Sequence, residues 1–445
     1  MSAPPIKMAH VSFPDPLMLA SLVPFLSLLI STLLMMVAFG LQSYVVPVRA
    51  VAEGWSTQTI TWIATGYTLG FTSSCIVTPK FILAVGHVRV FVALITLLSI
   101  AILLCSLMVD WRAWIVFRTI SGFAIAGSYL IIESWLNERV TNENRASVFS
   151  LYVMITMVGS VAGQYLVPLG DPTNTSLFIL CAIIFSVSLL PTALTSSPLP
   201  APPTQARFNV LKLYRRSPVA VVGAFLAGAL SGAWLNLGGV FTQRIGLSTA
   251  QGATLLAALL VGSTLAQIPI GRASDRMDRR LVMVACGLVG VAASLAMIAV
   301  QGGPPTLLYV VAAMVGSVLF PIYALNVAHA NDLAQPDEYV EVSSGMMIVY
   351  GMGTISGPLV AGPVMDRFGP TALFAVFTLY FAIYGGYAAW RIARRDAASG
   401  MVAKTDYQAM PVQPLGAEAS AAALQGESSD EPLIADTTTP QWTKP

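Results

Sequence analysis

The sequence predicts an all-α integral membrane protein in which twelve transmembrane helices form two six-helix bundles. Of the 445 residues, 56% are hydrophobic and only 10% are charged, whereas roughly a quarter of the residues of a soluble domain are charged. Apolar stretches recur between polar breaks, and each is long enough to cross about 30 Å of hydrocarbon. A soluble fold of this length could not bury so much apolar surface, so a membrane is the expected environment.

Twelve apolar stretches account for most of the chain. Their expected spans are 22–46, 57–78, 88–109, 113–135, 147–168, 176–195, 217–242, 249–270, 281–300, 306–328, 342–364 and 369–391. The first stretch is too long for the hydrophobic region of a cleavable signal peptide, and it lacks a small-residue cleavage site. We therefore expect it to remain in the membrane as the first helix.

The longest internal polar break divides these stretches into two groups of six. It is rich in proline and ends in a basic patch at 212–216. The expected organisation is a cytoplasmic N-terminus (1–21), an N-terminal bundle (22–195), a cytoplasmic linker (196–216), a C-terminal bundle (217–394) and a tail (395–445). The tail is polar, with more acids than bases, so we expect it to be disordered.

The basic residues of the loops predict the orientation in the membrane. The loops on one expected side carry four Lys and Arg residues, whereas the loops on the other side carry twelve. Positive residues concentrate on the cytoplasmic side of membrane proteins. The sequence therefore predicts a multi-pass protein of the inner or plasma membrane with both termini in the cytoplasm.

Two glycine motifs indicate an internal repeat. Gly159 and Gly163 lie four residues apart in the fifth stretch, and Gly353 and Gly357, followed by Pro358, lie 194 residues further along in the eleventh. Glycines at this spacing let membrane helices approach closely. Parallel six-helix repeats are an architecture of membrane transporters.

The most specific motif is the basic stretch 271–280. Its chemistry-bearing residues are Gly271, Asp275, Arg276, Arg279 and Arg280. We expect the glycine to end the eighth helix and the aspartate to accept hydrogen bonds from a nearby helix N-terminus. The arginines are expected to pair with this aspartate or with lipid phosphates. The alternative is that they only anchor the loop at the cytoplasmic face.

The fourth stretch carries ionisable side chains on one helical face. Arg118, Tyr129 and Glu133 fall within an arc of about 80° at 100° per residue. A charge at this depth costs about 2–3 kcal/mol unless it faces protein or water. If Arg118 faces a cavity, an anionic substrate is favoured. The alternatives are that Arg118 extends outward to the interface and that Glu133 lies among the lipid headgroups.

Three segments resemble motifs of the major facilitator superfamily: residues 271–280, 118–122 and 353–363. The resemblance covers about residues 17–395. Residues 133–137 and 86–89 further resemble the YcaD-like branch of that family. The loop after the second stretch lacks the Asp-Arg core of the family's first-half motif, so only one of two cytoplasmic latches is complete.

This resemblance implies transport by alternating access, with the first, fourth, seventh and tenth helices lining a central cavity. The implied substrate contacts are Gln42, Arg118, Tyr129, Asn236, Tyr323 and Asn326. Each of them is open to the alternative interpretation of a hydrogen bond between helices.

The driving force and the direction of transport stay open. Glu133 is the one candidate acid for proton coupling, and efflux, uptake and uniport are all compatible with the sequence. A second class of function is a non-transporting membrane sensor or scaffold. Such a protein would bind a cytoplasmic partner through the basic linker or the acidic tail.

Several other functions lack sequence support. The four cysteines lie in apolar stretches and the three histidines are scattered, so no metal site and no cofactor are predicted. The common ATP-binding and hydrolase motifs are missing, so we expect no enzyme. The expected partners are a small-molecule substrate, the lipid bilayer and a coupling proton, with no nucleic acid, and the expected state is a monomer.

Overall fold

The computed structural model describes residues 26–140, 145–193, 210–335 and 338–394, together with Tyr407 and Met410. Within these residues all regular structure is helical. Eleven helical stretches of this described part are long and apolar enough to cross a membrane, and Ser176–Thr192 is a shorter apolar helix. The predictions for 1–21, for 196–209 and for most of the tail lie outside the described residues.

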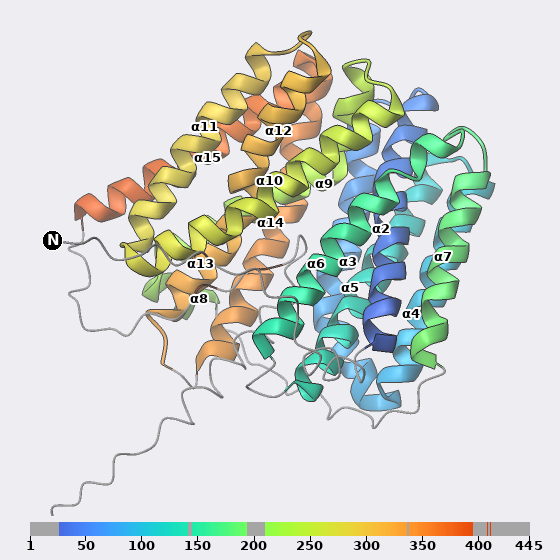
Figure 1. Cartoon of the computed structure of the whole chain (residues 1–445), viewed down its shortest axis with the longest axis horizontal. Coiled ribbons are helices and arrows are strands. Elements are labelled where there is room, and N and C mark those ends of the chain that lie inside the picture. The colour runs from blue at the N-terminus through green and yellow to red at the C-terminus, as the bar shows by residue number, and fades with distance from the viewer. Residues whose placement is uncertain are drawn as a thin grey trace, which may run out of the picture.

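We call residues 26–193 the first half and residues 210–394 the second half. The first half contains α2 (Leu26–Ala52), α3 (Thr57–Val85), α4 (His87–Leu107), α5 (Trp111–Arg139), α6 (Arg145–Gln164), the short η2 (Val167–Leu169) and α7 (Ser176–Ala193). The second half contains α8 (Val210–Arg216), α9 (Pro218–Arg244), α10 (Thr249–Arg276), α11 (Arg279–Ala299), α12 (Pro305–Leu319), α13 (Pro321–Asn331), α14 (Tyr339–Phe368) and α15 (Ala372–Arg394). Figure 1 shows the blue-to-green helices of the first half beside the light-green-to-red helices of the second half.

Local chemistry explains several helix ends. The side chain of Ser56 accepts a hydrogen bond from the Thr59 N–H at the start of α3, and Asp110 does the same for two N–H groups at the start of α5. Such caps satisfy N–H groups that have no partner within the helix. Pro321 has no N–H to donate, so the tenth predicted stretch is divided into α12 and α13 at this point.

Gly271 does not end a helix, and this expectation was wrong. Helix α10 continues to Arg276, and only Met277 and Asp278 separate it from α11. A glycine favours a helix end mainly when the backbone there takes a positive φ, and Gly271 does not have one. Its missing side chain instead gives room to another segment, because a Cβ at Gly271 would lie 2.6 Å from the Tyr407 ring.

Glycines form close helix contacts at related places in the two halves. A Cβ at Gly163 would lie 2.0 Å from the Val37 carbonyl oxygen of α2, and a Cβ at Gly357 would lie 2.0 Å from the Ala229 carbonyl oxygen of α9. The other glycine of each motif is similarly placed: a Cβ at Gly159 of α6 would lie 2.6 Å from Met36 Cβ, and a Cβ at Gly353 of α14 would lie 2.1 Å from the Phe225 carbonyl oxygen. These helix pairs therefore pack backbone against backbone.

A second pair of contacts follows the same pattern. Gly70 of α3 lies against Thr119 of α5, and Gly262 of α10 lies against Ala313 of α12. Gly70 and Gly262 are 192 residues apart, close to the 194 residues between Gly159 and Gly353. Equivalent helices of the two halves therefore use glycine at equivalent positions.

The two halves touch at the end that holds the α2–α3 turn. The Thr57 N–H donates to Asp366 Oδ1 over 3.1 Å, and Arg244 Nη1 lies 3.9 Å from the same oxygen. The Tyr44 hydroxyl donates to the Thr249 carbonyl over 2.9 Å. The Thr57 and Tyr44 contacts join α3 and α2 to α14 and α10, and the Arg244 contact joins α9 to α14 within the second half. We call this the outer end, following the predicted orientation, and the opposite end the inner end.

Candidate functional site

A small cavity of about 40 Å³ lies between the two halves. Residues of α2, α3 and α5 form one wall, and Leu235 and Asn236 of α9 belong to the other half. The polar residues at its wall are Ser43, Tyr67, Arg118 and Asn236. The apolar residues are Phe39, Val46, Pro47, Ala50, Ile60, Ile63, Ala64 and Leu235. The cavity is therefore largely apolar, with one cation.

Arg118 is the charged group of this cavity. It is 6% exposed, and its Cζ lies 4.5 Å from the centre of the Tyr67 ring. Within the described residues, Arg118 has no carboxylate within 4.0 Å, and its Nη1 atom has no hydrogen-bond partner. Contact of a cation with an aromatic face is worth about 2 kcal/mol when both are desolvated, less than the several kcal/mol of burying an unpaired charge. The guanidinium is thus a buried cation whose charge is not neutralised by any carboxylate of the described residues.

Asn236 and Gln42 differ in their relation to the cavity. Asn236 lies at its wall and donates through Nδ2 to the Gly232 carbonyl over 2.8 Å. Gln42 is fully buried in α2 and is not a wall residue, and neither polar atom of its amide has a partner in the described part of the chain. Buried polar groups without partners are uncommon in proteins, so Gln42 is a second group with unmet hydrogen bonds.

Tyr129 and Glu133 of α5 lie away from the cavity, further toward the inner end. The Tyr129 hydroxyl contacts the Met36 sulfur at 2.7 Å. Glu133 is 3% exposed and accepts a hydrogen bond from the Tyr152 hydroxyl over 2.9 Å. Fifteen residues separate Arg118 from Glu133, which corresponds to about 22 Å along a helix. The ionisable residues predicted to share one face of α5 therefore lie in two separate environments, Arg118 at the cavity and Glu133 beside Tyr152.

Tyr323 and Asn326 of α13 are buried in the second half and do not line the cavity. The Tyr323 ring lies 4.6 Å from the Tyr350 ring. Asn326 donates to the Ile322 carbonyl over 2.7 Å, and a Cβ at Gly223 would lie 2.1 Å from its Oδ1. Both residues join helices in this conformation.

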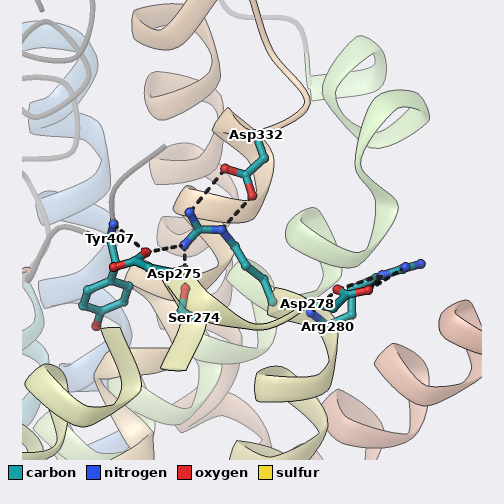
Figure 2. Close-up of polar contacts among 7 residues, drawn as sticks. Ser274, Asp275, Asp278, Arg280, Asp332 and Tyr407 are labelled. Carbon is teal, nitrogen blue, oxygen red and sulfur yellow. Dashed lines mark hydrogen bonds and ion pairs between the residues drawn. The ribbon is translucent and has the colours of Figure 1, made fainter. Parts of the chain in front are cut away.

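The 271–280 motif forms an ion-pair network at the inner end of α10 (Figure 2). Arg279 is only 2% exposed and donates to both carboxylate oxygens of Asp332, over 2.7 and 3.3 Å. It also reaches Ser274 at 2.5 Å and Asp275 at 3.5 Å. Paired donation of this kind is the strong form of an Arg–carboxylate contact. Arg279 therefore joins the end of α10 to the end of α13.

Arg280 pairs with its neighbour Asp278, whose side chain also caps α11. Although burial raises the pKa of Asp278, the hydrogen bonds from Arg280 hold it below its usual value. Asp275 accepts a hydrogen bond from the Tyr407 N–H over 3.1 Å. Arg276 lies in the last turn of α10, where a positive charge is favoured.

The basic patch 212–216 forms α8 and pairs within the chain. Lys212 Nζ lies 3.0 Å from Glu338 Oε1, and Arg216 binds the other oxygen of the same carboxylate. A hydrogen bond from the Gln335 N–H and this pairing lower the pKa of Glu338 to about 2. The patch is therefore joined to the start of α14.

Sequence reasoning missed three partners. Tyr67 under Arg118, Asp332 beside Arg279 and Asp366 beside Arg244 each lie on a helix far along the chain from the residue that they contact. An acid close to a helix end was the available signal for Asp332 and Asp366. Tyr67 gave no signal beyond being a polar aromatic residue inside an apolar stretch.

Comparison with known proteins decides the family. A sequence profile of the Major Facilitator Superfamily matches residues 28–263 and 220–424. The chain belongs to the major facilitator superfamily. An uncharacterized MFS-type transporter of Yersinia pestis (strain Pestoides F) is 25% identical over 365 residues, which are 81% of this chain and 94% of the relative. The uncharacterized MFS-type transporter YcaD of Escherichia fergusonii is 24% identical over 364 residues with the same coverage.

Two solved transporter structures show the same fold. The nucleoside transporter NupG superposes with a TM-score of 0.69 at 15% identity, over 82% of this chain and 98% of that one. A bacterial homolog of the lysosomal transporter Spinster, inward-facing and unoccupied, superposes with a TM-score of 0.63 at 15% identity, over 94% and 98%. The predicted resemblances to the superfamily and to its YcaD-like branch are thus confirmed, and the protein is a multi-pass secondary transporter.

Proposed function

We propose that this secondary transporter carries a small organic anion, and that Arg118 binds the anionic group. The supporting observation is a buried guanidinium at the wall of a cavity between the halves, with an Nη1 atom that has no partner among the described residues. Ionisable residues inside membrane proteins usually serve substrates or ions. The apolar remainder of the wall suits a substrate with an apolar body.

We propose alternating access between two six-helix bundles, 22–195 and 217–394, as the mechanism. Ser176–Ala193 would be the sixth of twelve spans, because its 18 residues correspond to about 27 Å. Helices α12 and α13 together would be the tenth. The glycine contacts at repeating positions support the two bundles. The outer-end contacts around Asp366 support an inward-facing state, in which the outer side is closed.

The orientation and the coupling are part of the same proposal. With the basic loops on the cytoplasmic side, both termini lie in the cytoplasm of a cell or inner membrane. Glu133 is the candidate proton carrier, since it is buried beside Tyr152 and away from Arg118. One solved relative is titled a fucose:proton symporter, so proton coupling exists within this fold. We propose a monomer that performs no covalent chemistry.

The 271–280 motif would stabilise one state of this cycle. Arg279, at the start of α11, contacts Ser274 and Asp275 of α10 and Asp332 at the end of α13. The inner end of the second half would therefore move as one body. Asp275 lies at the surface of that body, with a side chain that is 39% exposed. We propose that it meets the first half when the inner side closes.

A ligand screen tests the anion site directly. Purified protein would be heated with matched pairs such as benzoate and benzamide, with aliphatic and sugar acids, and with uncharged nucleosides and hexoses. A ligand at a hundred times its Kd stabilises the folded state by about 2.7 kcal/mol. We expect a carboxylate, but not its amide, to raise the Tm, and Arg118→Gln to abolish this rise. Equal stabilisation by the amide would contradict an anion site.

A further inference from the structure

Two residues of the C-terminal region dock on the inner part of α10. The Tyr407 N–H donates to Asp275 Oδ1 over 3.1 Å, and Gln267 Nε2 donates to the Met410 carbonyl over 3.1 Å. Met410 is 7% exposed and packs against the core. Figure 2 shows Tyr407 beside Asp275 and Ser274. Hydrogen bonds at two levels of one helix therefore hold Tyr407 and Met410 against α10.

Gly271 provides the surface that receives the Tyr407 ring. A Cβ at Gly271 would lie 2.6 Å from the ring carbon Cδ1, so the ring occupies the place of a side chain. Burial raises the pKa of the Tyr407 hydroxyl, and Cys286 of α11 and Asp275 add to the rise. The ring thus enters the second half between elements of the inner end. It occupies the Gly271–Asp275 part of the motif that the proposed function assigns to gating.

We propose that Tyr407 and Met410 form a clamp that binds the inner end of α10 and favours the inward-facing state. This inference rests on the proposed alternating access. At the outer end, the Tyr165 hydroxyl bonds Thr254 of α10 over 3.1 Å, so α10 faces the α6–η2 region of the first half. Closing the inner side brings the inner end of α10, with Tyr407 and Met410 docked on it, toward α6. A segment that binds one state better shifts the equilibrium toward that state.

The chain offers a matched pair of variants. The Tyr407 hydroxyl oxygen is buried and has no hydrogen-bond partner in the described part of the chain. Tyr407→Phe therefore keeps the ring on Gly271 and loses no hydrogen bond, whereas Tyr407→Ala removes the ring. A chain that stops after residue 400 removes the whole segment and serves as a second test.

Hydrogen–deuterium exchange of the protein in nanodiscs measures how readily the backbone opens at the inner end and at the outer end. For Tyr407→Ala and for the truncated chain we expect severalfold faster exchange in peptides covering 267–278, at the clamp, and in peptides covering 57–65 and 237–245, at the outer contacts. Tyr407→Phe should match the wild type. Unchanged exchange in all these peptides would overturn the clamp. Faster exchange at 267–278 alone would also overturn it, because the segment would then bind without favouring a state.

Asp366→Ala separates failure of the clamp from failure of the proposed function. This substitution removes the carboxylate that binds the Thr57 N–H and faces Arg244. If it speeds exchange at 237–245 and Tyr407→Ala does not, the clamp is wrong and alternating access stands. If neither variant changes exchange at the outer end, the two-state mechanism is wrong, and the clamp with it.

Discussion

The Arg118 guanidinium lies over the ring of Tyr67, with 4.5 Å between Cζ and the ring centre. The two residues come from α5 and α3, which pack closely because Gly122 and Gly70 bring their backbones together. The aromatic face stabilises the cation on one side without neutralising it. Arg118 therefore keeps its charge available to the cavity.

Tyr67 is expected to support Arg118 through its ring. Tyr67→Leu removes the aromatic face and should lower the free energy of unfolding by about 2 kcal/mol. Tyr67→Phe keeps the face and should retain most of the stability. Denaturant unfolding of both variants in detergent measures the difference, and equal losses would show that the ring does not stabilise the cation.

Asp366 is expected to keep the outer side closed. Asp366→Ala removes the acceptor of the Thr57 N–H, so the outward-facing state should gain population. A Ser43→Cys probe at the cavity wall, in a chain with Cys75→Ser, should then react faster with a membrane-impermeant thiol reagent added from outside. The probe in the parent chain is the control, and an unchanged labelling rate would argue against the outer closure.

Glu133 is expected to couple transport to protons. In Glu133→Gln the side chain can no longer exchange a proton, so a pH gradient should not drive accumulation of the anion found in the screen. Exchange of that anion without a gradient should persist. Proteoliposomes measure both processes. Full gradient-driven uptake by the variant would exclude Glu133 as the coupling group.

Glu338 is expected to hold α8 against the start of α14 through ion pairs that depend on pH. Its pKa is lowered from 4.5 to about 2, so its contribution to stability is present above pH 4.5 and is lost as the pH falls toward 2. Glu338→Gln should therefore have a lower Tm than the wild type at pH 7, and this difference should shrink below about pH 4.5. A difference that stays constant down to pH 2.5 would contradict the ion pair.

The glycine contacts are expected to be required for packing. A Cβ at Gly357 would lie 2.0 Å from a backbone oxygen, whereas nothing lies within 4 Å of a Cβ at Gly386. Gly357→Ala should therefore lower the Tm and the yield through overpacking of about 1–3 kcal/mol. Gly386→Ala should be neutral or slightly stabilising. Equal effects of the two substitutions would contradict backbone contact between α9 and α14.

The membrane spans could be predicted because they depend on local composition. The break at Pro321 depends on one residue that lacks an N–H, yet it was not foreseen, because a proline inside a membrane helix is often tolerated. The position of Arg118 at a cavity wall could be predicted because a lone charge in an apolar stretch is costly wherever the helix packs.

Contacts between distant segments could not be predicted in the same way. Gly271 suggested a helix end, but its actual role is to receive Tyr407, which lies 136 residues further along. The polar composition of the tail gives no indication that Tyr407 and Met410 pack on α10. Asn326 and Tyr323 were expected at the substrate, yet here they face other helices, and nothing in a single helix shows which neighbour it meets.

Transport by Arg118 variants tests the central claim most directly. Proteoliposomes with wild-type protein, Arg118→Lys or Arg118→Gln would be loaded with the anion identified by the screen, and uptake of its labelled form by exchange would be measured. We expect exchange by the wild type, weaker exchange by the lysine variant and none by the glutamine variant at equal amounts of folded protein. Exchange by Arg118→Gln with an unchanged KM and rate would contradict the anion site.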